Sequence, residues 1–132
     1  MQSLVDFLLA RIAEDERDAS AALRDVISAD GTIGARWWGA GSDVMAGRDD
    51  HVAAVSTGDL AVADHIARWD PARVLAECDA KRRIIGVHGL NEFNVDPCDA
   101  HDDTFASVPC DTVRLLALPY ADHPDYRDEW RP

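Results

Sequence analysis

The chain has 132 residues, of which 47% are hydrophobic and 29% charged, and its formal net charge is −12. This length and composition predict one soluble globular domain over residues 1–132. The negative charge argues against direct binding to nucleic acid or to an anionic membrane, because like charges repel. The negative charge leaves open a basic protein partner. A less favoured alternative is an acidic surface that imitates nucleic acid and inhibits a DNA-binding protein. Solubility alone also accounts for the charge.

The cysteine count and the N-terminus bear on location. The three cysteines are an odd number, and the sequence shows no secretory signal and no apolar run near the roughly 20 residues that span a bilayer. We therefore expect a cytoplasmic location, where clustered cysteine and histidine bind metal more often than cysteines form disulfides. Neither the identity of a protein partner nor the oligomeric state follows from the sequence.

The N-terminal stretch predicts a long amphipathic helix from Ser3 to about Ile27. Ser3 followed by Asp6 resembles a capping box, and Asp30-Gly31 is a stop signal. One apolar face recurs every three to four residues: Leu4, Leu8, Ile12, Ala19, Leu23 and Val26. The acidic residues between them are typical of a solvated helix face, although they could also dock a basic partner.

Residues 32–56 alternate short β-prone runs with glycines, which predicts two or three antiparallel strands. The runs cover residues 35–38, 43–46 and 51–56, with tight turns expected at residues 39–41 and 47–50. Trp37 and Trp38 are adjacent and must point to opposite faces of a strand. We expect one in the core and the other at the sheet edge or against a partner.

The rest of the chain predicts helices. A short helix follows Thr57-Gly58-Asp59, and a longer one runs from Pro71 to about Val87, because Asp70 favours the N-cap and proline the first helical position. A third covers residues 111–118, capped by Asp111 and ended by Pro119, before an aromatic tail that folds back over the core. The predicted fold is a mostly helical α+β domain: a long N-terminal helix, a short antiparallel β-meander and a helical C-terminal half with a zinc-clipped loop.

The loop between the last two predicted helices gathers metal-binding residue types. Cys98 and His101 form a Cys-x2-His pair of the kind that holds zinc on a turn, while His88 ends one helix and Cys110 starts the next. We expect these four side chains to bind a structural zinc ion, although their order matches no common zinc-finger pattern. Three alternatives remain: incidental cysteines and histidines, a Cys98–Cys110 disulfide, or a catalytic metal in a hydrolase whose base or oxygen ligand comes from nearby aspartates, namely Asp96, Asp99, Asp102 and Asp103.

Other catalytic templates are missing from the sequence. It contains no phosphate-binding GxxxxGK[ST] loop, no GxSxG elbow and no HExxH helix. Cys78 lies on an apolar helix face, which predicts an inert core residue, and His65 and His123 are interpreted as surface and turn residues. We therefore expect a non-enzymatic protein that acts through protein–protein contact.

Two blocks carry a family resemblance. Residues 65–88 begin His65-Ile-Ala-Arg-Trp-Asp-Pro, and residues 109–130 begin Pro109-Cys-Asp-Thr-Val-Arg. The chain resembles, over nearly its whole length, an uncharacterised domain-of-unknown-function family of actinobacteria and their phages. Members often carry Cys-x2-Cys where this chain has Cys98 and His101, so the resemblance favours the zinc site. It implies no activity, and it is compatible with a phage or mobile-element accessory factor.

Overall fold

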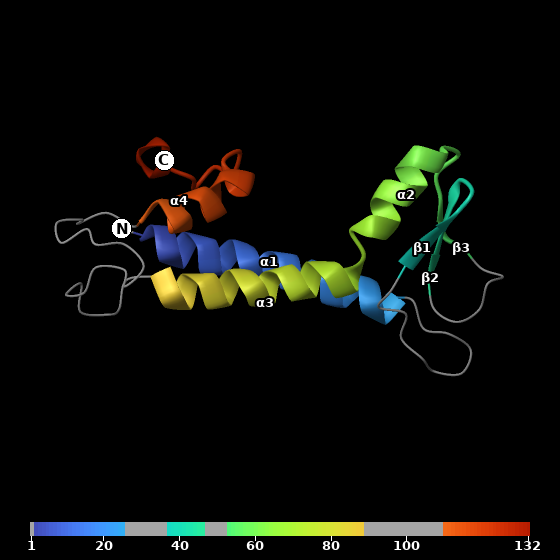
Figure 1. The fold of residues 1–132 in the computed structure, drawn as a ribbon, viewed down its shortest axis with the longest axis horizontal. Coiled ribbons are helices and arrows are strands. Elements are labelled where there is room, and N and C mark those ends of the chain that lie inside the picture. The colour runs from blue at the N-terminus through green and yellow to red at the C-terminus, as the bar shows by residue number, and fades with distance from the viewer. Residues whose placement is uncertain (1, 26–36, 47–52, 89–109) are drawn as a thin grey trace. The chain divides into compact units, whose positions relative to one another are not determined.

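The computed structural model describes residues 2–25, 37–46, 53–88 and 110–132. In these ranges the elements are, in order, α1 (Leu4–Asp25), β1 (Trp37–Ala40), β2 (Asp43–Ala46), β3 (Ala53–Ser56), α2 (Leu60–Arg68), α3 (Pro71–His88), α4 (Asp111–Ala117) and the 3₁₀ helices η1 (Leu118–Tyr120) and η2 (Asp128–Trp130) (Figure 1). This confirms the α+β class, the long N-terminal helix, the antiparallel meander and the helical second half.

The chain packs as two compact units. Unit 1 consists of Met1–Glu14 and Cys78–Pro132, and unit 2 of Asp15–Glu77. Each unit is described by itself below. The prediction that residues 1–132 form one domain stays a prediction.

The predicted capping box at the start of α1 is confirmed. Ser3 Oγ donates a hydrogen bond to the Asp6 carboxylate at 2.7 Å, and the Asp6 N–H donates to Ser3 Oγ at 3.1 Å. The hydrogen bonds from the Ser3 side chain and backbone hold the pKa of Asp6 below its ordinary value. A lowered pKa contributes stability at neutral pH that is lost as the pH falls through the pKa of the folded state, so acid weakens this cap.

Unit 1 is built on the first half of α1, which lies beside the second half of α3 (Figure 1). The predicted face residues are buried here: Leu4, Leu8 and Ile12. Cys78 is buried against the same helix, with Sγ 3.9 Å from the carbonyl oxygen of Ile12. The prediction of Cys78 as a core residue is confirmed.

The C-terminal tail covers α1 through Phe7, which is fully buried. Three tail rings surround it at centroid distances of 5.1–5.9 Å: His123, Tyr126 and Trp130. The neighbouring Arg11 is also buried, and its guanidinium bonds Glu14 at 2.8 Å and contacts the ring nitrogens of His123. A buried charge requires such partners. The predicted return of the tail over the core is confirmed, and His123 has a contact with α1 beyond its role in the turn.

In unit 2 the described strands form a three-stranded antiparallel sheet in the order β1–β2–β3. The first turn was predicted at residues 39–41, and its inclusion of Gly39 and Ala40 was wrong, whereas residues 35 and 36 of the predicted strand lie outside the described residues. The turn is instead Gly41-Ser42, where Gly41 adopts φ +64°, a conformation that tight two-residue hairpins require and that glycine reaches without strain. Gly39 and Ala40 therefore remain in the ladder, paired with Val44 and Asp43. The turn predicted at residues 47–50 lies outside the described residues.

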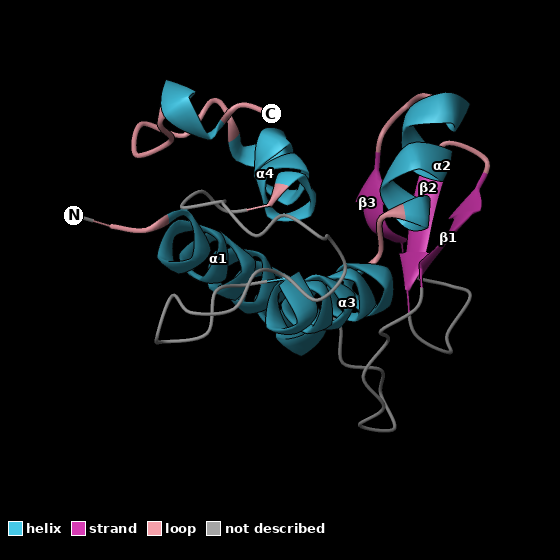
Figure 2. Cartoon of the chain, turned by 60° about the vertical axis from the view of Figure 1, so that its left-hand side comes forward, coloured by secondary structure: helices cyan, strands magenta, loops and turns pink. Residues whose placement is uncertain are grey.

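Helix α2 covers one face of this sheet (Figure 2). Val44, Ala63 and Ala67 form the buried contact, with Trp37 packed against them. The helix approaches β1 so closely that a Cβ on Gly39 would meet the Asp64 carboxylate. Trp38 is 36% exposed on the opposite face, which confirms that the two tryptophans point in opposite directions.

Asp70 joins the start of α3 to the start of β1. One carboxylate oxygen accepts the Arg73 N–H at 2.8 Å, as expected of an N-cap, and the other accepts the Trp37 N–H at 3.2 Å. Asp70 is buried, with only 4% of the residue exposed. The predicted helix start at Asp70-Pro71 is thus confirmed. The Asp70 carboxylate also binds the backbone of Trp37, the first residue of β1.

We expect Asp70→Ala to lower the free energy of unfolding by about 2–3 kcal/mol, because it removes an N-cap and leaves a second backbone N–H without its acceptor. The matched control is Asp59→Ala. Asp59 caps α2 by accepting only the Val62 N–H, at 3.0 Å, and should cost about 1 kcal/mol. Urea denaturation measures both variants. Equal losses would show that the bond to Trp37 contributes nothing.

Candidate functional site

The structure brings two of the four predicted zinc ligands together. His88 is the last residue of α3, and Cys110 immediately precedes α4. The Cys110 Sγ lies 3.8 Å from His88 Nδ1 and 3.7 Å from the His88 carbonyl oxygen, and both residues are half-buried. Cys98 and His101 lie outside the described residues. Two of the predicted ligands are therefore neighbours, and metal binding by them stays a prediction.

The separation of the two donor atoms can be compared with zinc geometry. Zn–S and Zn–N bonds of about 2.3 and 2.0–2.1 Å at a tetrahedral angle put sulfur and nitrogen about 3.6 Å apart. The observed 3.8 Å is close to that value, and it also fits a weak thiol–imidazole hydrogen bond. Among the described residues, no group of three or more histidine, cysteine or acidic side chains could hold a metal. The described part thus contains half of the predicted ligand set.

The predicted helix cap beside this pair was wrong. Cys110, rather than Asp111, is the N-cap of α4, and it makes no side-chain capping hydrogen bond. Asp111 lies inside the first turn and pairs with Arg114 at 3.2 Å. The boundary shifts by one residue because the extended backbone ends at Cys110, where φ is −63° and ψ is 160°. The aspartates proposed to serve a hydrolase, at positions 96, 99, 102 and 103, lie outside the described residues.

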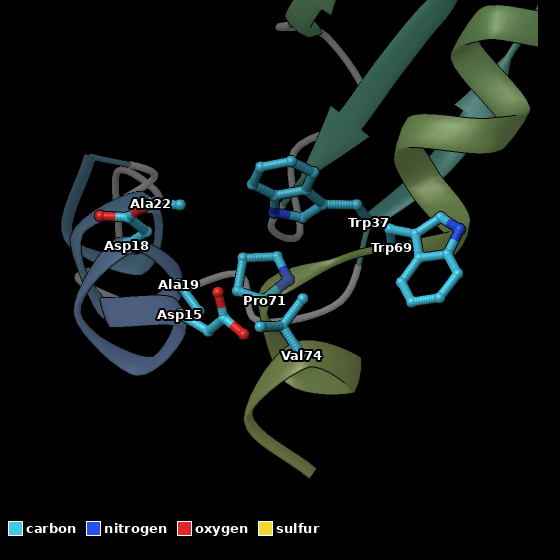
Figure 3. A pocket seen from close by; sticks show the side chains of 8 residues that line it. All are labelled: Asp15, Asp18, Ala19, Ala22, Trp37, Trp69, Pro71 and Val74. Atoms are coloured by element: carbon cyan, nitrogen blue, oxygen red, sulfur yellow. The ribbon is translucent and has the colours of Figure 1, made fainter. Parts of the chain in front are cut away.

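A pocket of about 190 Å³ opens within unit 2 (Figure 3). One wall comes from the second half of α1: Asp15, Asp18, Ala19 and Ala22. The other comes from β1, the end of α2 and the start of α3: Trp37, Trp69, Pro71 and Val74. In Figure 3 the Asp15 carboxylate points toward Pro71 and Val74, whereas the Asp18 carboxylate is turned away from Trp37. Sequence reasoning considered the acidic residues and the tryptophans separately and missed the pocket.

Trp69 already takes part in one cation–π contact. The Arg73 guanidinium carbon lies 4.1 Å from its ring centroid, and Arg73 Nε donates to Glu77 at 2.9 Å. Trp69 as a whole is 44% exposed. Unit 2 therefore contains a guanidinium held between an indole and a carboxylate, beside the pocket.

Comparison with known protein families assigns the chain to a family. The chain belongs to an uncharacterised domain family, as its resemblance implied. It matches the family of unknown function DUF6221 over residues 1–132. No curated protein and no solved structure matched the chain.

None of the helices in the described ranges combines the length and apolarity needed to cross a bilayer. His65 is exposed on α2, in agreement with its interpretation as a surface residue. The His88–Cys110 pair and the pocket of unit 2 are candidate sites in the part of the chain that the structure describes.

Proposed function

We propose that the chain is a non-enzymatic protein-binding domain whose loop between α3 and α4 is closed by a structural zinc ion. The zinc would be held by His88 and Cys110 together with Cys98 and His101. The observation that supports it is the 3.8 Å contact between two donor atoms 22 positions apart in the sequence. An ion at this point would tie the ends of a long connection to the two helices that flank it, which links metal binding to folding.

The binding role rests on the pocket of unit 2. Binding pockets are concave, largely apolar and furnished with a few polar groups, and this one has an apolar base with Asp15 and Asp18 on one wall. Tryptophan is enriched among the residues that contribute most to protein–protein affinity, and Trp69 is exposed at the edge of the pocket. The net charge of −12 favours a basic partner, because opposite charges speed encounter and select against acidic competitors.

A pull-down with the immobilised full chain tests the binding role. We expect a stoichiometric partner from a lysate of the cells that encode the protein, and we expect Asp18→Asn combined with Trp69→Ala to abolish its recovery. The matched control is Asp122→Asn, which removes the same charge from an exposed position in unit 1. Recovery of no partner, or equal recovery with both variants, would contradict the proposal.

A further inference from the structure

We propose that the C-terminal tail of unit 1 (residues 118–132) is a pH-sensitive latch, which stays docked on α1 only while the imidazole of His123 is neutral. This inference goes beyond the proposed function, because it depends neither on a zinc ion nor on the pocket of unit 2. It is carried by the hydrogen-bond donors and charges that surround His123 on α1 and within the tail.

Two donors converge on one ring nitrogen of His123. The backbone N–H of Asp125 donates to Nδ1 at 3.1 Å, and Nη1 of the Arg11 guanidinium lies 2.8 Å from the same atom. A nitrogen that accepts these bonds must carry a lone pair, so the imidazole of the docked tail is neutral. Arg11 Nη1 contacts Nε2 as well, and an imidazolium would offer it no acceptor at either nitrogen. Protonation would therefore turn hydrogen bonds into contacts between donors.

Two carboxylates near the ring oppose this effect only in part. The Asp125 carboxylate lies 3.9 Å from His123 Nδ1 and 3.9 Å from Arg11 Nη1, but Asp125 is exposed, so water and salt screen its attraction. Glu14, on α1, already pairs with Arg11 at 2.8 Å. Lost hydrogen bonds at 2.8 and 3.1 Å therefore outweigh the attraction of a screened carboxylate at 3.9 Å.

Burial strengthens the repulsion between Arg11 and a protonated His123. Arg11 is buried and His123 is half-buried, and charges in such positions are screened less than charges at the surface. Lys81 of α3 contacts Tyr120, three residues before His123, and contributes no negative charge that could offset the repulsion.

The docked tail also leaves two buried polar atoms without a hydrogen bond, namely Arg11 Nε and Tyr126 Oη. A buried donor that has lost its water and gained no partner is unfavourable. Release of the tail would return both atoms to water. Docking therefore already carries an unfavourable contribution, to which protonation of His123 adds.

The direction of the pH response follows from these contacts. A free imidazole gains its proton near pH 6.5, whereas aspartate and glutamate side chains stay largely ionised down to about pH 5. A docked state that excludes this proton is fully stable above that range and loses stability as the pH falls through it. For one imidazole, the opening equilibrium should rise about tenfold between pH 7.5 and pH 5.5.

The test measures amide hydrogen exchange of the full chain at pH 7.5 and pH 5.5, from milliseconds to hours, by mass spectrometry of peptic fragments. Each observed rate is divided by the intrinsic rate at the same pH, so that only the opening of the structure is compared. We expect protection of the tail fragment to fall about fivefold to tenfold at pH 5.5. Protection of a fragment from α2 should change less than about twofold, because that helix belongs to unit 2.

His123→Asn is the decisive variant, because an asparagine carbonyl can accept where Nδ1 accepts but takes no proton in this pH range. Its tail protection should change less than about twofold between the two pH values. The matched control is His65→Asn, at an exposed position of α2, which should keep the native response. Arg11→Gln tests the charge in a tail that retains His123, and it should reduce the response by at least about half.

Two results would overturn the proposal. The first is native tail protection that changes less than about twofold between the two pH values. The second is a full native response in His123→Asn, which would assign the effect to one of the other four histidines. If the tail of His123→Asn were unprotected at both pH values, Arg11→Gln would decide, and a full native response there would reject the latch.

Discussion

Chelation is expected to lower the melting temperature of the purified chain by about 10 °C or more, if zinc closes the loop between α3 and α4. A structural ion contributes its binding free energy to folding, and each kcal/mol corresponds to about 3–5 °C for a domain of this size. Elemental analysis should first find one zinc per chain. Melting is then measured before and after treatment with a chelator, and again after zinc is restored. Absence of metal together with unchanged melting would remove the zinc proposal.

The Cys110→Ser variant separates metal binding from local packing. It should lose the ion and reproduce the lowered melting temperature of the chelated protein, because a serine hydroxyl is a poor zinc ligand. Cobalt substitution adds a direct readout, since thiolate ligation of Co²⁺ gives a charge-transfer absorption that should be weaker in Cys110→Ser. The variant His88→Ala should likewise lose the ion. Its control is His65→Ala, because His65 is exposed on α2 and is not among the predicted ligands. Equal effects of the two histidine substitutions would contradict the assignment of His88.

The second large effect is expected at Phe7. Phe7→Ala should lower the free energy of unfolding by about 3–5 kcal/mol, because it leaves a cavity beneath the rings of His123, Tyr126 and Trp130. That loss is a large share of the 5–15 kcal/mol typical of whole domains. Denaturant midpoints followed by the fluorescence of Trp130 report the loss of tail packing, provided the other tryptophans are replaced by phenylalanine in the background chain.

Leu115→Ala is the control for Phe7→Ala. Leu115 is a large apolar residue that is 54% exposed, so its truncation should change stability by no more than about 0.5 kcal/mol. A loss below about 1 kcal/mol for Phe7→Ala would show that the tail does not pack on α1 in solution.

Capping residues in the sequence correctly predicted where α1 and α3 begin. Ser3 with Asp6 marks the start of α1, and Asp70 with Pro71 marks the start of α3, because caps depend on residues only a few positions away. The turn after the first strand was misplaced because several glycines could supply it, and the choice depends on the pairing of Gly39 with Val44. Sequence alone does not contain that pairing.

The contacts that sequence analysis missed join residues far apart in the chain. Phe7 belongs to the core because the tail returns to it, and Arg11 is buried because His123 lies against it. The pocket likewise needs the second half of α1 beside the start of α3. Of the four predicted zinc ligands, His88 and Cys110 lie close together in the structure. The zinc ion and its ligation by all four residues stay a prediction.

The carboxylate of Asp70 has a consequence for how unit 2 opens. It accepts one N–H from β1 and one from α3, so neither backbone donor can exchange with solvent unless that single side chain gives up a bond. Local opening reactions follow such shared contacts and release contiguous groups of amides together. We therefore expect the start of β1 and the first turn of α3 to open together, although 33 positions separate Trp37 from Asp70.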